Sequence, residues 1–198
     1  IQSVMEDLGP KFERATGHKL AITFATLGAT VKRVQGGEIA DVVIIPQQGI
    51  DSLVKDGKAP AGNVTVIARA GIVVAVRKGA PKPDISSPDA LKRTLLAAKS
   101  IAYVDPASGG ASGIHFAKVL DRLGIANEMQ SKTVFPNPKT PAEVGVVVAN
   151  GEAEIGVPLI QQLMSVAGID LVGPLPGDLQ ATTVFSAAIM TGAKDAAA

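Results

Sequence analysis

Serine, threonine and glycine gather where predicted strands give way to predicted helices. The longest such segment is DPASGGASG at residues 105–113, in which Ser108 and Ser112 offer hydroxyls while Gly109 and Gly110 let the backbone approach a ligand closely. Free N–H groups and the helix dipole favour an anion at such a helix start. Helix capping by serine is an equally compatible interpretation. No lysine follows as in a P-loop, so a nucleotide P-loop is excluded.

A second segment repeats this design earlier in the chain. Thr26, Leu27, Gly28 and Ala29 follow an apolar run and precede a predicted helix. Ligands of open α/β sheets bind beyond the carboxyl ends of strands, so two such junctions predict an anion-binding cleft between two lobes.

A third junction and one arginine complete the candidate binding residues. Thr140 is a potential N-cap with Pro141 at the first helical position, and capping alone would explain this pair. Arg69 lies inside an apolar run, where an unpaired guanidinium is costly. It can clamp a carboxylate or another oxyanion, pair with an acidic residue such as Asp41, or occupy an exposed edge position.

The inventory of catalytic side chains is small. A dyad of Ser112 and His115 with Asp105 is conceivable, but no G-x-S-x-G elbow is present, and a serine at a helix start is usually a cap. His18 and His115 are far apart in sequence and there is no cysteine, so we expect no metal site. We therefore expect no catalytic residues, no cofactor and no enzyme.

Composition excludes several classes of function. The 198 residues are 46% hydrophobic, and 19 Lys+Arg against 18 Asp+Glu give a net charge of +1, so nothing indicates nucleic-acid binding. No run approaches the roughly 18 apolar residues of a membrane span. Without Trp and with one Tyr and five Phe, the chain is poorly suited to binding by aromatic stacking.

Alternating strands and helices predict an α/β fold with mixed, mainly parallel sheets flanked by helices. The run at residues 41–45 reads as a strand buried on both faces, and residues 64–76 as two strand segments. The chain begins on a helix and stops where another could start, so we expect an opening strand and a closing helix to be missing. The expected helices lie at residues 1–16, 30–35, 50–56, 89–99, 114–123, 141–150 and 159–166. The other expected strands lie at residues 19–25, 100–104, 133–135, 153–157, 171–172 and 182–190.

Several stretches resemble the periplasmic molybdate-binding-protein family, within the type 2 periplasmic solute-binding proteins. They are GPKFERATGHKLAITFA, VQGGEIADVVII, IDSLVKDGK, VAVRKGAPKPDI, VDPASGGASGIHFAKVLDRLGI and VVANGEAEIGVPLIQQL. The resemblance covers essentially the whole chain, and its most specific markers are ADVVII after a GG turn and DPxxxxxSG before a helix.

The resemblance implies a two-lobed binder that closes like a hinge on a small anion and passes it to the permease of an ABC transporter. Lobe 1 would comprise residues 1–70 and 184–198 and lobe 2 residues 71–183, with crossings near residues 69–72 and 182–185. Matching loops imply ligand contacts at residues 26–29, 108–113 and 140–141. The protein would be periplasmic or secreted, and peripheral to a membrane at most.

Three departures from the family pattern alter the expected ligand. Leu27 replaces a typical serine, Leu159 replaces a ligand-binding tyrosine, and Pro46-Gln47-Gln48 replaces an acidic turn. Lost hydroxyls remove donors from a site that depends on their number. We expect an anion other than molybdate, such as a small organic acid held with the help of Arg69. Alternatives are a ligand-sensing domain of a regulator and a hydrolase-type enzyme that uses Ser112 and His115.

Overall fold

The chain divides into two compact units. The computed structural model describes residues 2–136 and 143–194. Unit 1 comprises Ile1–Arg69 and Thr183–Ala198, and unit 2 comprises Ala70–Thr182, so the chain passes twice between them. Within the described residues, no helix is long and apolar enough to cross a membrane.

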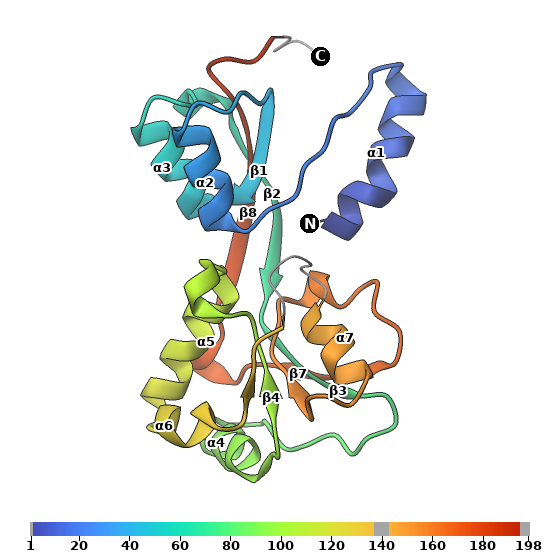
Figure 1. Ribbon diagram of the computed structural model, residues 1–198, viewed down its shortest axis with the longest axis vertical. Helices are drawn as coiled ribbons and strands as arrows, with labels where there is room; N and C mark the ends of the chain where they lie inside the picture. Colours follow the sequence, from blue (N-terminus) through green and yellow to red (C-terminus); the bar gives the residue numbers. More distant parts are fainter. Residues whose placement is uncertain (1, 137–142, 195–198) are drawn as a thin grey trace. The chain divides into compact units, whose positions relative to one another are not determined.

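Unit 1 is built on a three-stranded sheet in the order β1-β8-β2 (Figure 1). The strands are β1 (Val42–Pro46), β8 (Thr182–Ile189) and β2 (Val64–Gly71). β1 runs antiparallel to β8, with Val42 opposite Ile189. Helices α2 (Leu27–Gln35) and α3 (Gln47–Lys55) pack against the sheet, and η1 (Ala61–Asn63) precedes β2. The core of this unit contains Val34, Val43, Ile45, Ile50, Leu53, Ala59, Ala188 and Met190.

β1 is not buried on both faces, contrary to the expectation from its apolar sequence. Its residues alternate between buried and exposed, and Val42 is 51% exposed. The physical reason is that β1 lies at the edge of its sheet: β8 is its partner on one side, and no described strand pairs with the other.

The expected strand at residues 19–25 is also wrong, because the segment between α1 (Gln2–Thr16) and α2 has no regular structure. No described strand offers it backbone partners. The segment packs against α1 instead: a Cβ built on Gly9 would lie 3.6 Å from Leu20 and 3.5 Å from Ile22. The Leu20 N–H donates to the Glu13 carboxylate at 2.7 Å.

Unit 2 has a five-stranded sheet in the order β5-β4-β6-β3-β7. Figure 1 shows α5 and α6 on one side of this sheet and α7 on the other. β4 pairs in parallel with β5 and β6, whereas β3 pairs antiparallel with β6 and β7, so parallel pairing is less general than expected. The strands are β3 (Val73–Arg77), β4 (Ile101–Ala102), β5 (Thr133–Val134), β6 (Ile155–Gly156) and β7 (Ile169–Pro174). The helices are α4 (Pro88–Ala97), α5 (Ala111–Arg122), α6 (Ala126–Gln130) and α7 (Glu143–Ala149).

Two helix predictions in unit 2 need correction. α5 begins at Ala111, three residues earlier than expected, because Gly110 takes the N-cap position. The helix expected at residues 159–166 is reduced to the single turn η3 (Ile160–Gln162). Leu159 there forms a β-bridge with Ile72, and Leu163 packs on Gly145 of α7. The apolar residues of this segment therefore pack against neighbouring elements instead of forming one face of a helix.

Candidate functional site

The loop between β4 and α5 is fixed by its own hydrogen bonds. Asp105 starts the turn η2 (Pro106–Ser108): its carboxylate accepts the Ala107 N–H at 2.9 Å, and its backbone carbonyl accepts the Ser108 hydroxyl at 2.7 Å. Gly109 follows in the left-handed region with a φ of 76°, a conformation that favours glycine. The Ser108 hydroxyl proton is thus already donated within the loop, so Ser108 shapes the loop.

The first turn of α5 presents donors that lack protein acceptors. The backbone N–H groups of Ala111, Ser112 and Gly113 have none among the described residues, and the first helical bond runs from the Ile114 N–H to the Gly110 carbonyl at 3.0 Å. Ser112 is only 4% exposed, and none of the side-chain hydrogen bonds among the described residues involves its hydroxyl. Unsatisfied donors at the positive end of a helix dipole can hold an anion.

A close approach of helix to strand places this turn at the end of β4. A Cβ built on Gly113 would lie 1.9 Å from the Val104 carbonyl oxygen, and one built on Gly110 would lie 2.5 Å from the Val104 side chain. Only glycine therefore fits at position 113. The absence of two side chains lets the α5 amides sit directly beside the strand end.

His115 lies one turn further along α5 and is held by a distant segment. Its Nε2 is 2.9 Å from the carbonyl oxygen of Leu179, in the turn η4 (Gly177–Leu179). Arg122 reaches the same turn: its Nη1 donates to the Asp178 carbonyl at 3.2 Å, and its Nη2 forms an ion pair with the Asp178 carboxylate. The structure gives no hydrogen bond between His115 and Ser112, so the conceivable dyad is not formed. Sequence reasoning missed this anchor, because Leu179 is 64 residues away.

Tyr103 comes shortly before the loop and packs against two phenylalanine rings. Its ring makes edge-on contacts with Phe116 of α5 at 5.1 Å and with Phe135 at 5.2 Å between centroids. Burial is the main cause that raises the pKa of Tyr103, and a hydrogen bond with Thr133 opposes this shift. The phenol remains neutral at neutral pH, so Tyr103 acts here as a packing residue.

The corresponding loop of unit 1, before α2, has fewer donors available to an anion. The Thr26 hydroxyl caps α2 by accepting the Ala29 N–H at 3.4 Å. Leu27 packs against α3, since a Cβ on Gly49 would be 2.4 Å from a Leu27 methyl group. The residues that remain available to an anion are Leu27 and Gly28, through their backbone N–H groups at the start of α2.

Arg69 is exposed on β2, at the edge of the sheet of unit 1. No ion pair of Arg69 occurs among the residues that the structure describes, and Asp41 instead accepts the Lys194 N–H at 2.8 Å. The edge position is therefore the one observed, and the pairing with Asp41 is not. Thr140 and Pro141 lie outside the described residues.

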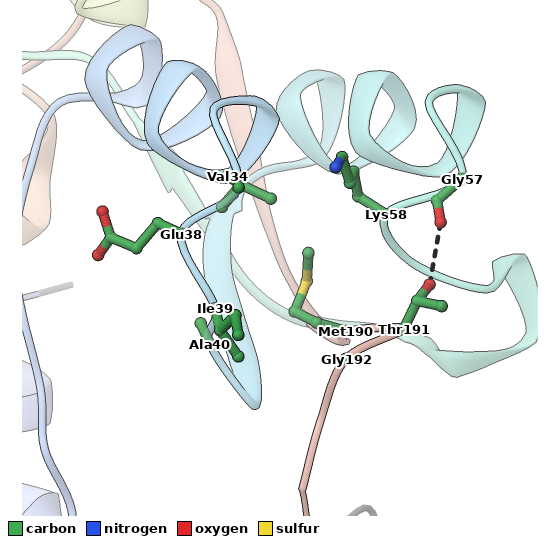
Figure 2. Close-up of a pocket in the computed structure, with 10 residues that line it drawn as sticks. Val34, Glu38, Ile39, Ala40, Gly57, Lys58, Met190, Thr191 and Gly192 are labelled. Atoms are coloured by element: carbon green, nitrogen blue, oxygen red, sulfur yellow. Dashed lines mark hydrogen bonds between the residues drawn. The ribbon is translucent and has the colours of Figure 1, made fainter.

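A cavity in unit 1 lies away from all predicted site residues. It has a volume of about 270 Å³ and is found where α2, α3 and β8 end (Figure 2). The Thr191 hydroxyl donates to the Gly57 carbonyl at 3.0 Å across one side of it. Helix C-termini present carbonyl groups, which do not favour an anion. The α5 turn thus remains the best-supported site.

Comparisons with known proteins agree on the family. The model of the family described as "Bacterial extracellular solute-binding protein" matches residues 1–198. An aconitate isomerase of Pseudomonas sp. is 37% identical over 198 residues, covering 96% of this chain and 72% of that protein. The molybdate-binding protein ModA of Azotobacter vinelandii is 29% identical over 196 residues, covering 96% and 74%. The solved Azotobacter vinelandii periplasmic molybdate-binding protein superposes with a TM-score of 0.77 at 21% identity, covering 98% of this chain and 84% of that one.

These findings confirm the α/β fold of type 2 periplasmic binding proteins and the resemblance to molybdate-binding proteins. They also correct one expectation. The chain was expected not to be an enzyme, but a relative that is 37% identical is named for an isomerase activity. Because the family model matches all 198 residues of the chain, the chain belongs to the bacterial extracellular solute-binding protein family.

Proposed function

We propose that the chain binds a small polycarboxylate anion at the first turn of α5. When this anion is an unsaturated polycarboxylate such as aconitate, we propose that the chain also interconverts its isomers. The observation that carries the proposal is the set of unsatisfied donors there. Three backbone N–H groups and the hydroxyl of Ser112, a residue that is 4% exposed, have no acceptor among the described residues. A carboxylate supplies two acceptor oxygens of the required charge.

Further residues are proposed as anion contacts on chemical grounds. Arg69 is exposed and no carboxylate of the described residues pairs with it, and guanidinium groups bind carboxylates in a two-pronged manner. The Leu27 and Gly28 N–H groups are donors of the same kind as those of α5. For Ser108, Gly109, Thr26 and Ala29 we propose a supporting role in shaping the loops, and Thr140 and Pro141 stay proposed as anion contacts on the basis of the resemblance alone.

The proposed ligand and reaction rest on the relative named aconitate isomerase. Aconitate is an unsaturated tricarboxylate, and a shift of one proton along its three-carbon unit moves the double bond and interconverts the cis and trans isomers. The departures at Leu27 and Leu159 fit a ligand other than molybdate.

Binding for transport is the second candidate function. The relatives named molybdate-binding proteins favour it. In this case the same anion would be captured outside the cytoplasm and handed to the permease of an ABC transporter.

The test combines binding and turnover. Cis-aconitate, trans-aconitate, the saturated propane-1,2,3-tricarboxylate and molybdate are compared by thermal shift and calorimetry, and isomerisation is followed by proton NMR. We expect the tricarboxylates to raise the melting temperature by mass action and molybdate not to. Conversion of trans- to cis-aconitate supports the isomerase, and binding without conversion supports transport.

A matched pair of serine variants locates the site. Ser112→Ala is expected to weaken tricarboxylate binding about 10-fold, the loss of one hydrogen bond to a charged group. Ser131→Ala, an exposed serine at the end of α6, serves as control and should bind as the unchanged protein does. If no carboxylate binds, or if Ser112→Ala binds normally, the proposal is wrong.

A further inference from the structure

We infer that His115 is the proton-transfer group for the isomerisation, an inference that rests on the proposed function. Proton removal from carbon needs a base beside the bound substrate. Two properties of His115 support this role: its place on the first turns of α5, and the tautomer in which its ring is held.

Helix geometry brings the His115 side chain to this turn. Residues three apart on a helix are neighbours, with about 5–6 Å between their Cβ atoms, so His115 adjoins Ser112. Side chains on a helix also lean toward its N-terminus, which favours a position of the imidazole beside the turn that carries the unsatisfied N–H groups. The residue is half-buried and is not enclosed in the core.

The Leu179 contact fixes the tautomer of the neutral imidazole. A carbonyl oxygen can only accept, so the Nε2 atom at 2.9 Å from it must carry the hydrogen. The other nitrogen, Nδ1, then holds a lone pair, and no donor to it exists among the described residues. The anchor thus orients the ring and leaves one basic atom available, which is how a third group orients a general base in other enzymes.

Asp105 and Tyr103 are the other titratable groups near this turn. The Asp105 carboxylate accepts the Ala107 N–H within its own turn. The Tyr103 phenol is buried between Phe116 and Phe135 and interacts with Thr133. Among the described residues of this loop and turn, the basic atoms left without a hydrogen-bond donor are therefore Nδ1 of His115 and the second oxygen of Asp105, and of the two residues only His115 lies on α5 itself.

The proton shift balances without any co-reactant. Nδ1 removes one proton from the methylene carbon of aconitate, and the electron pair of that C–H bond forms the new double bond while the old one opens. The negative charge passes onto the substrate carboxylates, where the α5 N–H groups stabilise it. The imidazolium then returns the proton to the opposite end of the three-carbon unit, so His115 ends as it began.

The experiment compares four variants with the unchanged protein, of which His115→Ala serves for rescue by added imidazole. In His115→Gln the amide can still donate to the Leu179 carbonyl, so folding is expected to be retained and is checked by thermal melting. His18→Gln alters the other histidine of the chain, which is exposed and stacks on Phe12. Arg122→Gln removes the other side chain that binds η4, and it tests whether loss of a contact between α5 and η4 is by itself enough to lower activity.

We expect His115→Gln to lower kcat about 100-fold or more while KM and calorimetric affinity change by less than about three-fold. Exchange of the methylene protons in D2O should be lost with it, and imidazole should partly restore the activity of His115→Ala. His18→Gln and Arg122→Gln should keep kcat within about three-fold.

Retention of kcat by His115→Gln, or an equal loss in Arg122→Gln, would overturn the role of His115 while the proposed function stands. If the unchanged protein binds aconitate without proton exchange, the role of His115 is overturned and the binding function remains. If it binds no carboxylate, both are overturned.

Discussion

Replacing Gly113 by alanine should separate α5 from β4 and weaken the anion site with it. The added Cβ would lie 1.9 Å from the Val104 carbonyl oxygen and 2.8 Å from its carbonyl carbon, both backbone atoms that cannot rotate away. Relief requires a separation of at least about 1 Å, which strips contacts from the α5 residues packed against the sheet. Phe116, Val119 and Leu120 are those residues, and each is at most 3% exposed.

We expect this change to destabilise unit 2 by about 3 kcal/mol, the upper range for overpacking a well-filled core. For a domain of this size, such a loss lowers the melting temperature by roughly 10 °C. Scanning calorimetry measures it, because two units can unfold in separate transitions. Gly62→Ala is the control: nothing lies within 4 Å of its built Cβ. A Gly113→Ala protein that melts within about 1 °C of the unchanged one would refute the reasoning.

Three further predictions concern other residues. Tyr103 is the one tyrosine of a chain without tryptophan, so its absorbance titration is unambiguous and should have a midpoint above the ordinary pKa of 10.0; a midpoint at or below 10.0 contradicts it. Because the pKa of Tyr103 is raised by folding, its contribution to stability is complete below 10.0 and is lost as the pH rises through the higher folded value. Arg69→Gln should weaken tricarboxylate binding about 10-fold in calorimetry without changing the melting temperature, whereas Arg14→Gln on α1 should alter neither. Gln180→Ala should lower stability by about 1 kcal/mol in urea unfolding, since the Gln180 amide donates to the Ile72 carbonyl at 3.0 Å; an unchanged midpoint would show that this bond contributes nothing.

Local patterns in the sequence predicted most of the helices and strands in their order. They failed where contacts with residues distant in the sequence determine the local structure. The apolar alternation at residues 19–25 is typical of a strand, yet a strand needs a partner with free backbone groups, and the sequence does not reveal one. Leu159 and Leu163 have a helical spacing but serve a bridge to Ile72 and packing on Gly145, both distant in sequence.

The candidate site likewise has features that local sequence indicates and features that depend on distant residues. Glycine and serine indicated a helix start in this segment, because capping and dipole effects act over a few residues, but α5 begins at Ala111, three residues earlier than expected. The interpretation of Ser108 as a ligand donor missed its bond to the Asp105 carbonyl. The anchoring of His115 could not be predicted, since its partner Leu179 is reached only through the fold.

The edge position of β1 has a consequence for the sheet of unit 1. Along one side of this strand no described residue occupies the backbone hydrogen-bonding groups, and the side chain of Val42 and the nearby Ile39, which is 70% exposed, add apolar surface. Open strand edges recruit further strands, and charged or proline residues are the usual safeguards. Asp41 before the strand and Pro46 at its end flank four apolar residues that carry neither. A further strand can therefore pair along this edge and extend the sheet of unit 1.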